Sequence, residues 1–390
     1  MKSLGKILGL VILGLLLILV AAGFALPHLF DPNDYKDALR QLARDKAGLE
    51  LTINGDIGWS LFPWLGLELH ETTLASTQTP DQPLADLRML GLSVRVLPLL
   101  QREVQMRDIT VNGLNLTLGR DQQGRAYFKT RAERDHNSVV LRQADQAGID
   151  FFAFKVLDKA TLEDFDRKLQ AYGVKTERIP AGELLETGER VRFKIPTGHT
   201  IELYAEKTDV GNGIGYQDPD VDVLDGPGIR PIRMDHALIY GGDIDGNVKL
   251  FTEVLGFTLV ERVKLEDGKT DLAVWLTCSA KAHDIAMVRH GEDGKLHHVS
   301  FQMPSWESVL RAADIMSVNR VSIDIGPTRH GITQGTTIYF FDPSGNRLET
   351  FCGGYDHYPD MHPITWSWEH VGRGIFYHDR KLNAAFLSVV

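Results

Sequence analysis

The sequence is poor in cysteine and in basic charge, and these two scarcities exclude several classes of protein. Only two cysteines occur in 390 residues, Cys278 and Cys352, and they lack the CxxC spacing of a zinc site. Two distant thiols do not make a disulfide framework, so the C-terminal part is cytosolic in style. The formal net charge of −10 speaks against a nucleic-acid partner, because Lys and Arg hold phosphate backbones.

One long apolar run stands apart from this otherwise ordinary globular composition. Lys2 and Lys6 precede an uncharged stretch over residues 7–26, and 20 helical residues rise about 30 Å, the thickness of a bilayer core. Residues 1–28 are therefore predicted to be a transmembrane anchor, with the N-terminus mildly favoured on the cytoplasmic side. The alternative is a signal peptide cleaved near Ala25, although the run is long for that purpose.

Residues 29–118 are predicted to form a small β-rich segment. Residues 65–70 and 108–118 alternate between apolar and polar side chains, as strands do, and a helix is expected over residues 33–47. The stretches 31–35 (DPNDY) and 55–64 (GDIGWSLFPW) resemble the opening of AsmA-family envelope proteins. That resemblance covers about residues 1–124 and implies an inner-membrane-anchored, β-rich protein.

The remainder of the chain contains an internal repeat. A constant separation of 147 residues (349 − 202 = 147) relates four pairs: Pro196 and Pro343, Gly198 and Gly345, Glu202 and Glu349, His136 and His283. Such a constant offset indicates a duplicated domain. We therefore predict one domain over residues 119–225 and a second over residues 226–390.

Each copy runs in the order strand, helix and several strands. Asp158 or Thr161 is expected to cap the first helix and Gly173 to end it, and each copy closes with a hairpin across a Pro-x-Gly turn. Ser305 is expected to cap the second helix, whose inward residues are predicted to be Trp306, Val309, Leu310 and Ala313. A finer repeat aligns residues 234–239 with 296–301, so the C-terminal domain is itself a pair of βαβββ modules. The predicted fold class is α+β, built from repeated βαβββ modules.

The finer repeat also indicates a metal site. It places His236 opposite His298 at the same position of each module's first strand, and Glu349 falls on the last strand of the second module. Two histidines and one carboxylate form the facial triad of non-haem iron(II) oxygenases, which leaves positions open for a substrate and dioxygen. Any one of these histidines alone could be a hydrogen-bonded core residue. The first copy has Phe151 in place of His298, so only the second copy is expected to bind metal.

His297 is the immediate neighbour of a predicted ligand. Successive strand residues point to opposite faces, so we expect His297 to be structural. Trp306 and Trp366 are expected to be core residues.

Three C-terminal stretches resemble the catechol 2,3-dioxygenase family, type I extradiol enzymes of the vicinal oxygen chelate fold: residues 322–331 (SIDIGPTRHG), 337–347 (TIYFFDPSGNR) and 374–379 (GIFYHD). The resemblance runs from about Gly119 to Val390. It implies that Fe(II) is held by His236, His298 and Glu349. It further implies that His283 steadies bound oxygen and moves protons, that His330 hydrogen-bonds a substrate hydroxyl, and that Tyr339 lies near the catecholate. His283 and Tyr339 could instead be packed core residues.

The resemblance predicts the reaction of catechol or a substituted catechol with dioxygen to give 2-hydroxymuconic semialdehyde. The alternative is a non-enzymatic, membrane-anchored AsmA-like envelope protein with a vestigial dioxygenase fold. Two expectations conflict, because the family is cytoplasmic and typically tetrameric whereas the apolar run predicts a membrane anchor. The first copy also lacks its opening strand and helix, which predicts reduced stability or aggregation.

Overall fold

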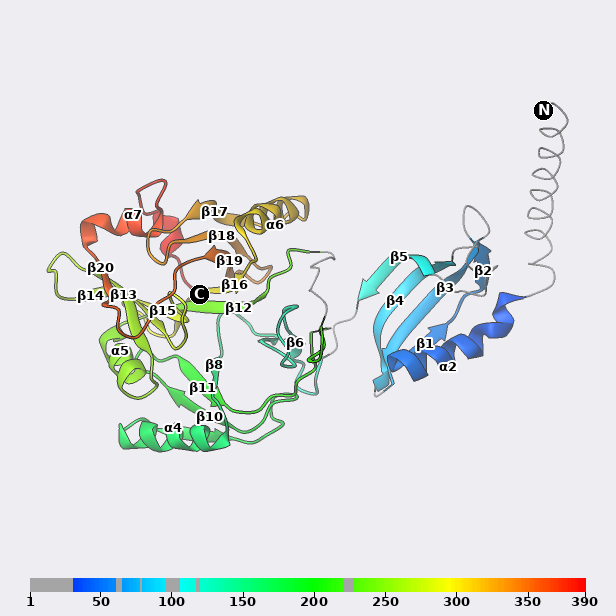
Figure 1. Cartoon of the computed structure of the whole chain (residues 1–390), viewed down its shortest axis with the longest axis horizontal. Coiled ribbons are helices and arrows are strands. Elements are labelled where there is room, and N and C mark those ends of the chain that lie inside the picture. The colour runs from blue at the N-terminus through cyan, green and yellow to red at the C-terminus, as the bar shows by residue number, and fades with distance from the viewer. Residues whose placement is uncertain are drawn as a thin grey trace, which may run out of the picture. The chain divides into compact units, whose positions relative to one another are not determined.

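The computed structural model describes residues 31–60, 65–77, 79–94, 106–116, 120–212, 214–219 and 228–390. The chain divides into two compact units, Met1–Arg120 and Asp121–Val390 (Figure 1). The predicted transmembrane segment lies outside the described residues. Among the helices that are described, none is long and apolar enough to cross a membrane.

The first unit is an antiparallel sheet with a helix packed against it. The short helix η1 (Pro32–Tyr35) leads into α2 (Lys36–Ala47), and Asp31 caps this start by accepting a hydrogen bond from the Asn33 amide. The strands are β1 (Leu49–Ile53), β2 (Ile57–Ser60), β3 (Leu65–Ser76), β4 (Thr79–Val94) and β5 (Met106–Leu116), in the order β1-β3-β4-β5 with β2 on β3. Leu39 and Ala43 of α2 pack on a small core of Leu51, Ile53, Ile57 and Leu69. The predicted helix and strands of this segment are confirmed.

The first copy of the repeat contains one βαβββ module. Its elements are β8 (Phe152–Lys155), α4 (Lys159–Ala171), β9 (Thr176–Ile179), β10 (Arg190–Lys194) and β11 (Thr200–Tyr204), in the sheet order β8-β11-β10-β9. Asp158 caps α4 by accepting from the Thr161 amide, and Gly173 follows with a φ of 95°, as the sequence predicted. A separate two-stranded sheet, β6 (Ala126–Phe128) with β7 (Val139–Leu141), precedes the module. Between Thr79 and Asp150 the described residues contain no helix.

The second copy contains two βαβββ modules in one nine-stranded sheet. The first module is β12 (Arg233–Gly241), α5 (Ile244–Glu253), β13 (Thr258–Lys264), β14 (Asp271–Thr277) and β15 (Ile285–Arg289). The second module is β16 (Lys295–Gln302), α6 (Trp306–Val318), β17 (Ile323–Arg329), β18 (Gly335–Phe341) and β19 (Arg347–Gly353). A C-terminal segment adds β20 (Ile364–Trp366), η2 (Trp368–His370), α7 (Val371–Ile375) and η3 (Ala384–Leu387). The sheet order is β17-β18-β19-β16-β12-β15-β14-β13-β20, so the predicted fold of repeated βαβββ modules is confirmed.

The inner face of α6 differs in part from the prediction. Ser305 caps this helix as expected, and Val309, Ala312 and Met316 are buried. Leu310, predicted to face inward, is 41% exposed. The spacing 309, 312 and 316 defines the buried stripe, and Leu310 is rotated about 100° from Val309, outside that stripe.

The two copies are joined by equivalent hairpin turns. The His199 ring nitrogen Nε2 donates to the Lys295 carbonyl at 3.0 Å, and the Gly148 amide donates to Asn346 Oδ1 at 2.9 Å. Both contacts obey the repeat offset, because 199 + 147 = 346 and 148 + 147 = 295. In each copy the residue that follows the Pro-x-Gly turn, His199 or Asn346, therefore bonds the other copy at or just before its first strand.

Candidate metal centre

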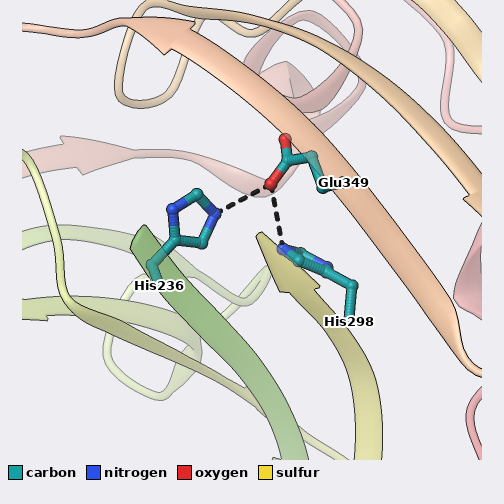
Figure 2. Close-up of side chains that lie close together, drawn as sticks. All are labelled: His236, His298 and Glu349. Carbon is teal, nitrogen blue, oxygen red and sulfur yellow. Dashed lines mark ion pairs between the residues drawn. The ribbon is translucent and has the colours of Figure 1, made fainter. Parts of the chain in front are cut away.

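Three adjacent strands bring His236, His298 and Glu349 to one point. β12 and β16 pair antiparallel at the centre of the sheet, with His236 opposite Ser300, and β16 pairs with β19 so that Ser300 lies opposite Glu349. His298 precedes Ser300 by two residues and shares its face. One potential ligand atom from each of the three residues lies within 4.8 Å of the others, and all three side chains are buried (Figure 2).

The hydrogen bonds of the neighbouring His297 determine the tautomer of His298. His297 Nε2 lies 2.6 Å from the Phe386 carbonyl, which only accepts, so this nitrogen carries a proton. Burial lowers the pKa of His297 well below its usual value, and the ring is therefore neutral with Nδ1 as an acceptor. His298 Nδ1, at 2.7 Å, must donate to it. The lone pair of His298 Nε2 is left facing the site, as metal ligation requires.

His236 is oriented in a similar way by a carboxylate. Its Nδ1 donates to Asp235 Oδ2 at 2.9 Å, and Nε2 faces Glu349 Oε2 at 2.8 Å. Burial alone would lower the pKa of His236, but the carboxylates of Glu349 and Asp235 outweigh it and raise the pKa to about 9. Burial lowers the pKa of His298 to about 4.

The carboxylate of Glu349 fits a shared cation. Oε1 accepts a hydrogen bond from Thr337 Oγ1 at 2.5 Å, whereas Oε2 is buried without a hydrogen bond although it faces both histidines. Burial opposes ionisation, but the adjacent His236 and the surrounding donors hold the pKa of Glu349 well below its usual range. Oε2 lies 2.8 Å from His236 Nε2 and 3.4 Å from His298 Nε2, so two imidazole nitrogens and one ionised carboxylate oxygen converge on one point, a suitable donor set for a non-haem metal ion.

The three further residues predicted for the site lie around the same point. The His283 and His236 rings are 3.9 Å apart, and Lys281, which bonds both the Asp235 carbonyl and Asp284, ties the loop of His283 to β12. His330 Nδ1 donates to the Ile375 carbonyl, and its Nε2 accepts from the Tyr339 hydroxyl at 2.9 Å. Tyr339 and His330 therefore form a hydrogen-bonded pair beside Glu349.

All six predicted site residues line one cavity. Its remaining walls are largely apolar and come from Leu238, Trp275, Ile332, Thr333, Phe351, Ile375 and Phe386. Apolar walls around a few convergent polar groups are typical of a site for a small organic ligand.

The first copy lacks this chemistry for a visible reason. Its Glu202 is fully buried like Glu349, but Arg192 and Arg190 pair with it at 2.6 and 3.3 Å. The Phe151 ring, in the position of His298, lies 5.8 Å from the Arg192 guanidinium carbon. Guanidinium groups thus supply the positive charge that a metal ion would supply in the second copy.

Three contributors to the site were not predicted from the sequence. His297 was expected to be structural on the opposite strand face, yet its ring reaches back to His298 Nδ1. The other two contributors are Asp235, the sequence neighbour of His236, and Thr337, which lies on β18 beside the strand of Glu349 and donates to Oε1 of that carboxylate. Adjacency of an acid to His236 was the available signal for Asp235, since ligand histidines commonly donate to a carboxylate.

Comparison with known proteins agrees with this geometry. The family model of the catechol 2,3-dioxygenase-like N-terminal domain matches residues 149–208, and that of the glyoxalase/bleomycin resistance protein/dioxygenase superfamily matches residues 233–350. Metapyrocatechase of Pseudomonas sp. (strain CF600) is 50% identical over 300 residues, 77% of this chain and 96% of that protein. The chain belongs to the catechol 2,3-dioxygenase family.

The chain is also similar to two further dioxygenases and, at its N-terminus, to the AsmA family. The crystal structure of the 2,3-dioxygenase LapB from Pseudomonas sp. KL28 has 63% identity and a TM-score of 0.63 over 64% of this chain and 88% of LapB. A manganese-dependent 2,3-dihydroxybiphenyl 1,2-dioxygenase of Geobacillus genomosp. 3 is 29% identical over 76% of this chain and 96% of its own length. The AsmA family model matches residues 1–148.

The dioxygenase match extends into the region that the AsmA model also covers. Residues 119–390 number 272 (390 − 118), fewer than the 300 matched residues. Residues upstream of Gly119 therefore contribute to the match, and in the structure those that are described form strands of the first unit.

Metal affinity is expected to rise about tenfold per pH unit between pH 6 and pH 8, because ligands must be deprotonated to bind. Below a pKa of about 9, His236 has one proton to lose, whereas His298, with a pKa of about 4, is already neutral. Anaerobic titration against a chelator, corrected for protonation of the chelator, measures this slope. A flat profile, or a slope of two protons, would contradict the assignment.

Proposed function

We propose that this chain opens the ring of catechol with dioxygen, giving 2-hydroxymuconic semialdehyde with both oxygen atoms incorporated. The observation that carries the proposal is the convergence of His236, His298 and Glu349 with three proton-handling side chains in one buried cavity. The metapyrocatechase relative supports the same reaction, since half of the aligned residues are identical across nearly its whole length.

Fe(II) is the metal we propose for this centre, held by the two histidines and Glu349. The donor set is that of non-haem iron(II) oxygenases. When bound, Fe(II) supplies a redox-active centre that lets electrons of a chelated ring reach dioxygen. The Geobacillus relative is named as manganese-dependent, so both metals are to be compared in the assay.

Proton transfer is the role proposed for His330 and Tyr339. Burial, and then the charge of Glu349, raises the pKa of Tyr339 well above its usual value, so its hydroxyl keeps its proton at neutral pH. The Nδ1–H of His330 is anchored on the Ile375 carbonyl, and Nε2 faces the Tyr339 hydroxyl as an acceptor. A catechol hydroxyl displacing the Tyr339 hydroxyl from Nε2 would lose its proton to that nitrogen.

His283 is proposed to serve the other side of the cavity. Burial, and then the positive charge of His236, lowers the pKa of His283 well below its usual value. The ring is therefore neutral at physiological pH and can take up a proton and return it to an oxygen atom of the reacting group. The apolar walls exclude water, so these transfers stay within the cavity.

The test is to load the purified full chain anaerobically with Fe(II), add catechol and admit air. The expected result is the yellow absorbance of the ring-fission product, with both atoms of labelled ¹⁸O₂ recovered in it. Protein that holds iron stoichiometrically and forms no product would refute the proposal. Protein that is folded and takes up no metal would instead favour the envelope-protein alternative.

A further inference from the structure

A buried carboxylate outside the metal centre joins three separate segments of the second unit. Glu261 lies on β13 and is 1% exposed. Its Oε1 accepts from the Thr333 amide at 2.6 Å and from the Tyr355 hydroxyl at 2.7 Å, and its Oε2 accepts from Trp366 Nε1 at 2.7 Å. These three donors are 72, 94 and 105 residues away in the sequence, and none of them is charged.

The segments that Glu261 joins build one wall of the catalytic cavity. The turn between β17 and β18 carries His330, Ile332 and Thr333, all of which line the cavity, as does Ile375 of the C-terminal segment. The amides of Gly331 and Ile332 both donate to the Gly374 carbonyl, at 2.8 and 2.9 Å. This turn and the C-terminal segment are therefore one hydrogen-bonded layer.

Trp366 fills the space between the turn and the C-terminal segment. A Cβ added at Gly331 would lie 3.1 Å from the Trp366 ring, and one at Gly374 would lie 3.5 Å from it. β20 pairs with β13 with Ile364 opposite Glu261, and the Glu261 bond to Nε1 fixes the orientation of the indole ring. Glu261 thus holds the ring on which the turn rests.

The turn itself needs an external partner. Thr333 and Gln334 have φ values of 61° and 58°, a left-handed conformation that costs residues other than glycine about 1 kcal/mol or more. Thr333 is buried, and its amide in this conformation is satisfied by Glu261. Loss of that acceptor leaves a buried amide unsatisfied in an already strained turn, which favours rearrangement.

The position of the His330 ring depends on both parts of this layer. Its backbone amide donates to the Gly335 carbonyl at the end of the turn, and its Nδ1 donates to the Ile375 carbonyl. Neither contact involves the strands that carry His236, His298 or Glu349. A change in the layer therefore moves His330 without moving the metal ligands.

We propose that Glu261 is a positioning residue, which clamps the turn 331–334 to the C-terminal segment and thereby holds His330 Nε2 toward the substrate. The inference rests on the proposed ring-cleaving function for its kinetic consequence. Its structural part, the clamped turn, stands without it. A carboxylate suits the role because its two oxygens accept all three bonds, whereas a glutamine at this position would turn one acceptor into a donor facing a donor.

The experiment compares Glu261→Gln with Asp271→Asn in the full chain. Asp271 is a buried carboxylate of the neighbouring strand β14 that pairs with Lys264 and Arg262, and among the described residues it makes no hydrogen bond or ion pair with the turn. In Glu261→Gln, amide hydrogen exchange over residues 331–335 is expected to accelerate about 10-fold or more, with exchange in β12 and β16 unchanged. Iron content is expected to stay at the wild-type level, and Asp271→Asn is expected to leave exchange in the turn unchanged.

The kinetic readout is a double-mutant cycle with His330→Phe. Glu261→Gln alone is expected to lower kcat about 10-fold, and in the His330→Phe background it is expected to lower kcat further by less than about 2-fold, because both changes act through one group. Trp366→Phe removes one of the three donors to Glu261 and should lower kcat by a smaller factor, again mainly when His330 is present. This variant replaces Glu261→Gln in the cycle if Glu261→Gln does not fold.

Fully additive losses of kcat, or unchanged exchange at the turn in both variants, would overturn the proposal. Failure of the wild-type chain to cleave catechol would refute the proposed function instead, and the exchange measurement would still decide whether Glu261 clamps the turn.

Discussion

Replacing His298 by alanine is expected to abolish both ring cleavage and stoichiometric iron. The change removes one of the three metal-ligand atoms, Nε2 of His298. The lone pair of this nitrogen faces the site because His298 Nδ1 donates to His297, which in turn donates to the Phe386 carbonyl. Loss of a partner behind a ligand costs about 10- to 100-fold in metal affinity, so loss of the ligand itself is expected to exceed about 100-fold. Iron analysis after gel filtration and the catechol assay measure the two effects.

His378→Ala is the matched control for this variant, because His378 is an exposed histidine in the same C-terminal domain. It is expected to keep wild-type iron content and activity. Circular dichroism and a thermal melt show whether His298→Ala remains folded. A folded His298→Ala protein with full iron would remove His298 from the ligand set, and with it the proposed geometry of the centre.

Replacing His283 by phenylalanine is expected to lower kcat about 100-fold while iron content remains unchanged. The ring of similar size keeps the packing beside His236, whose ring lies 3.9 Å away, but it can neither accept nor return a proton. Because the pKa of His283 lies well below its usual value, the wild-type ring is neutral across pH 6 to 8. The loss in the variant is therefore expected to be nearly constant across that range.

Steady-state kinetics at saturating oxygen, with iron measured on the same samples, tests this expectation. His283→Gln, which keeps hydrogen bonding but titrates no proton, distinguishes proton transfer from simple hydrogen bonding, since it should be almost as slow as the phenylalanine variant. Full kcat in either variant would show that His283 only packs against His236. Loss of iron in both variants would show that it supports the ligand sphere.

The sequence predicted the features of this protein that depend on local pattern or on the repeat. Helix caps at Asp158 and Ser305 follow from a few neighbouring residues, and both are present. Equivalent positions in two modules meet at the centre of one sheet, so the alignment of His236 with His298 also placed them together in space. These inferences needed no knowledge of distant contacts.

The features that the sequence did not reveal depend on contacts between distant segments. His297 bonds the carbonyl of a residue 89 positions away, and Glu261 bonds an indole 105 positions away. Strand alternation gives the direction of the His297 side chain but not the reach of its ring, so it did not reveal the hydrogen bond to His298. The prediction that Leu310 faces inward was wrong for a simpler reason. Its apolar side chain does not show whether it lies within the buried stripe of the helix or beside it.

The arginines around Glu202 have a consequence for how the chain survives a shortage of metal. Their charge is covalently attached, so neither a chelator nor an oxidant can remove it from the first copy. In the second copy the ion proposed for the equivalent carboxylate is exchangeable, and with a pKa of about 9 His236 carries a proton at neutral pH that can take the place of that ion. We therefore expect loss of the metal to lower activity far more than the folded fraction, because His236 and Glu349 still form an ion pair without it, and renewed metal is expected to restore activity without new synthesis.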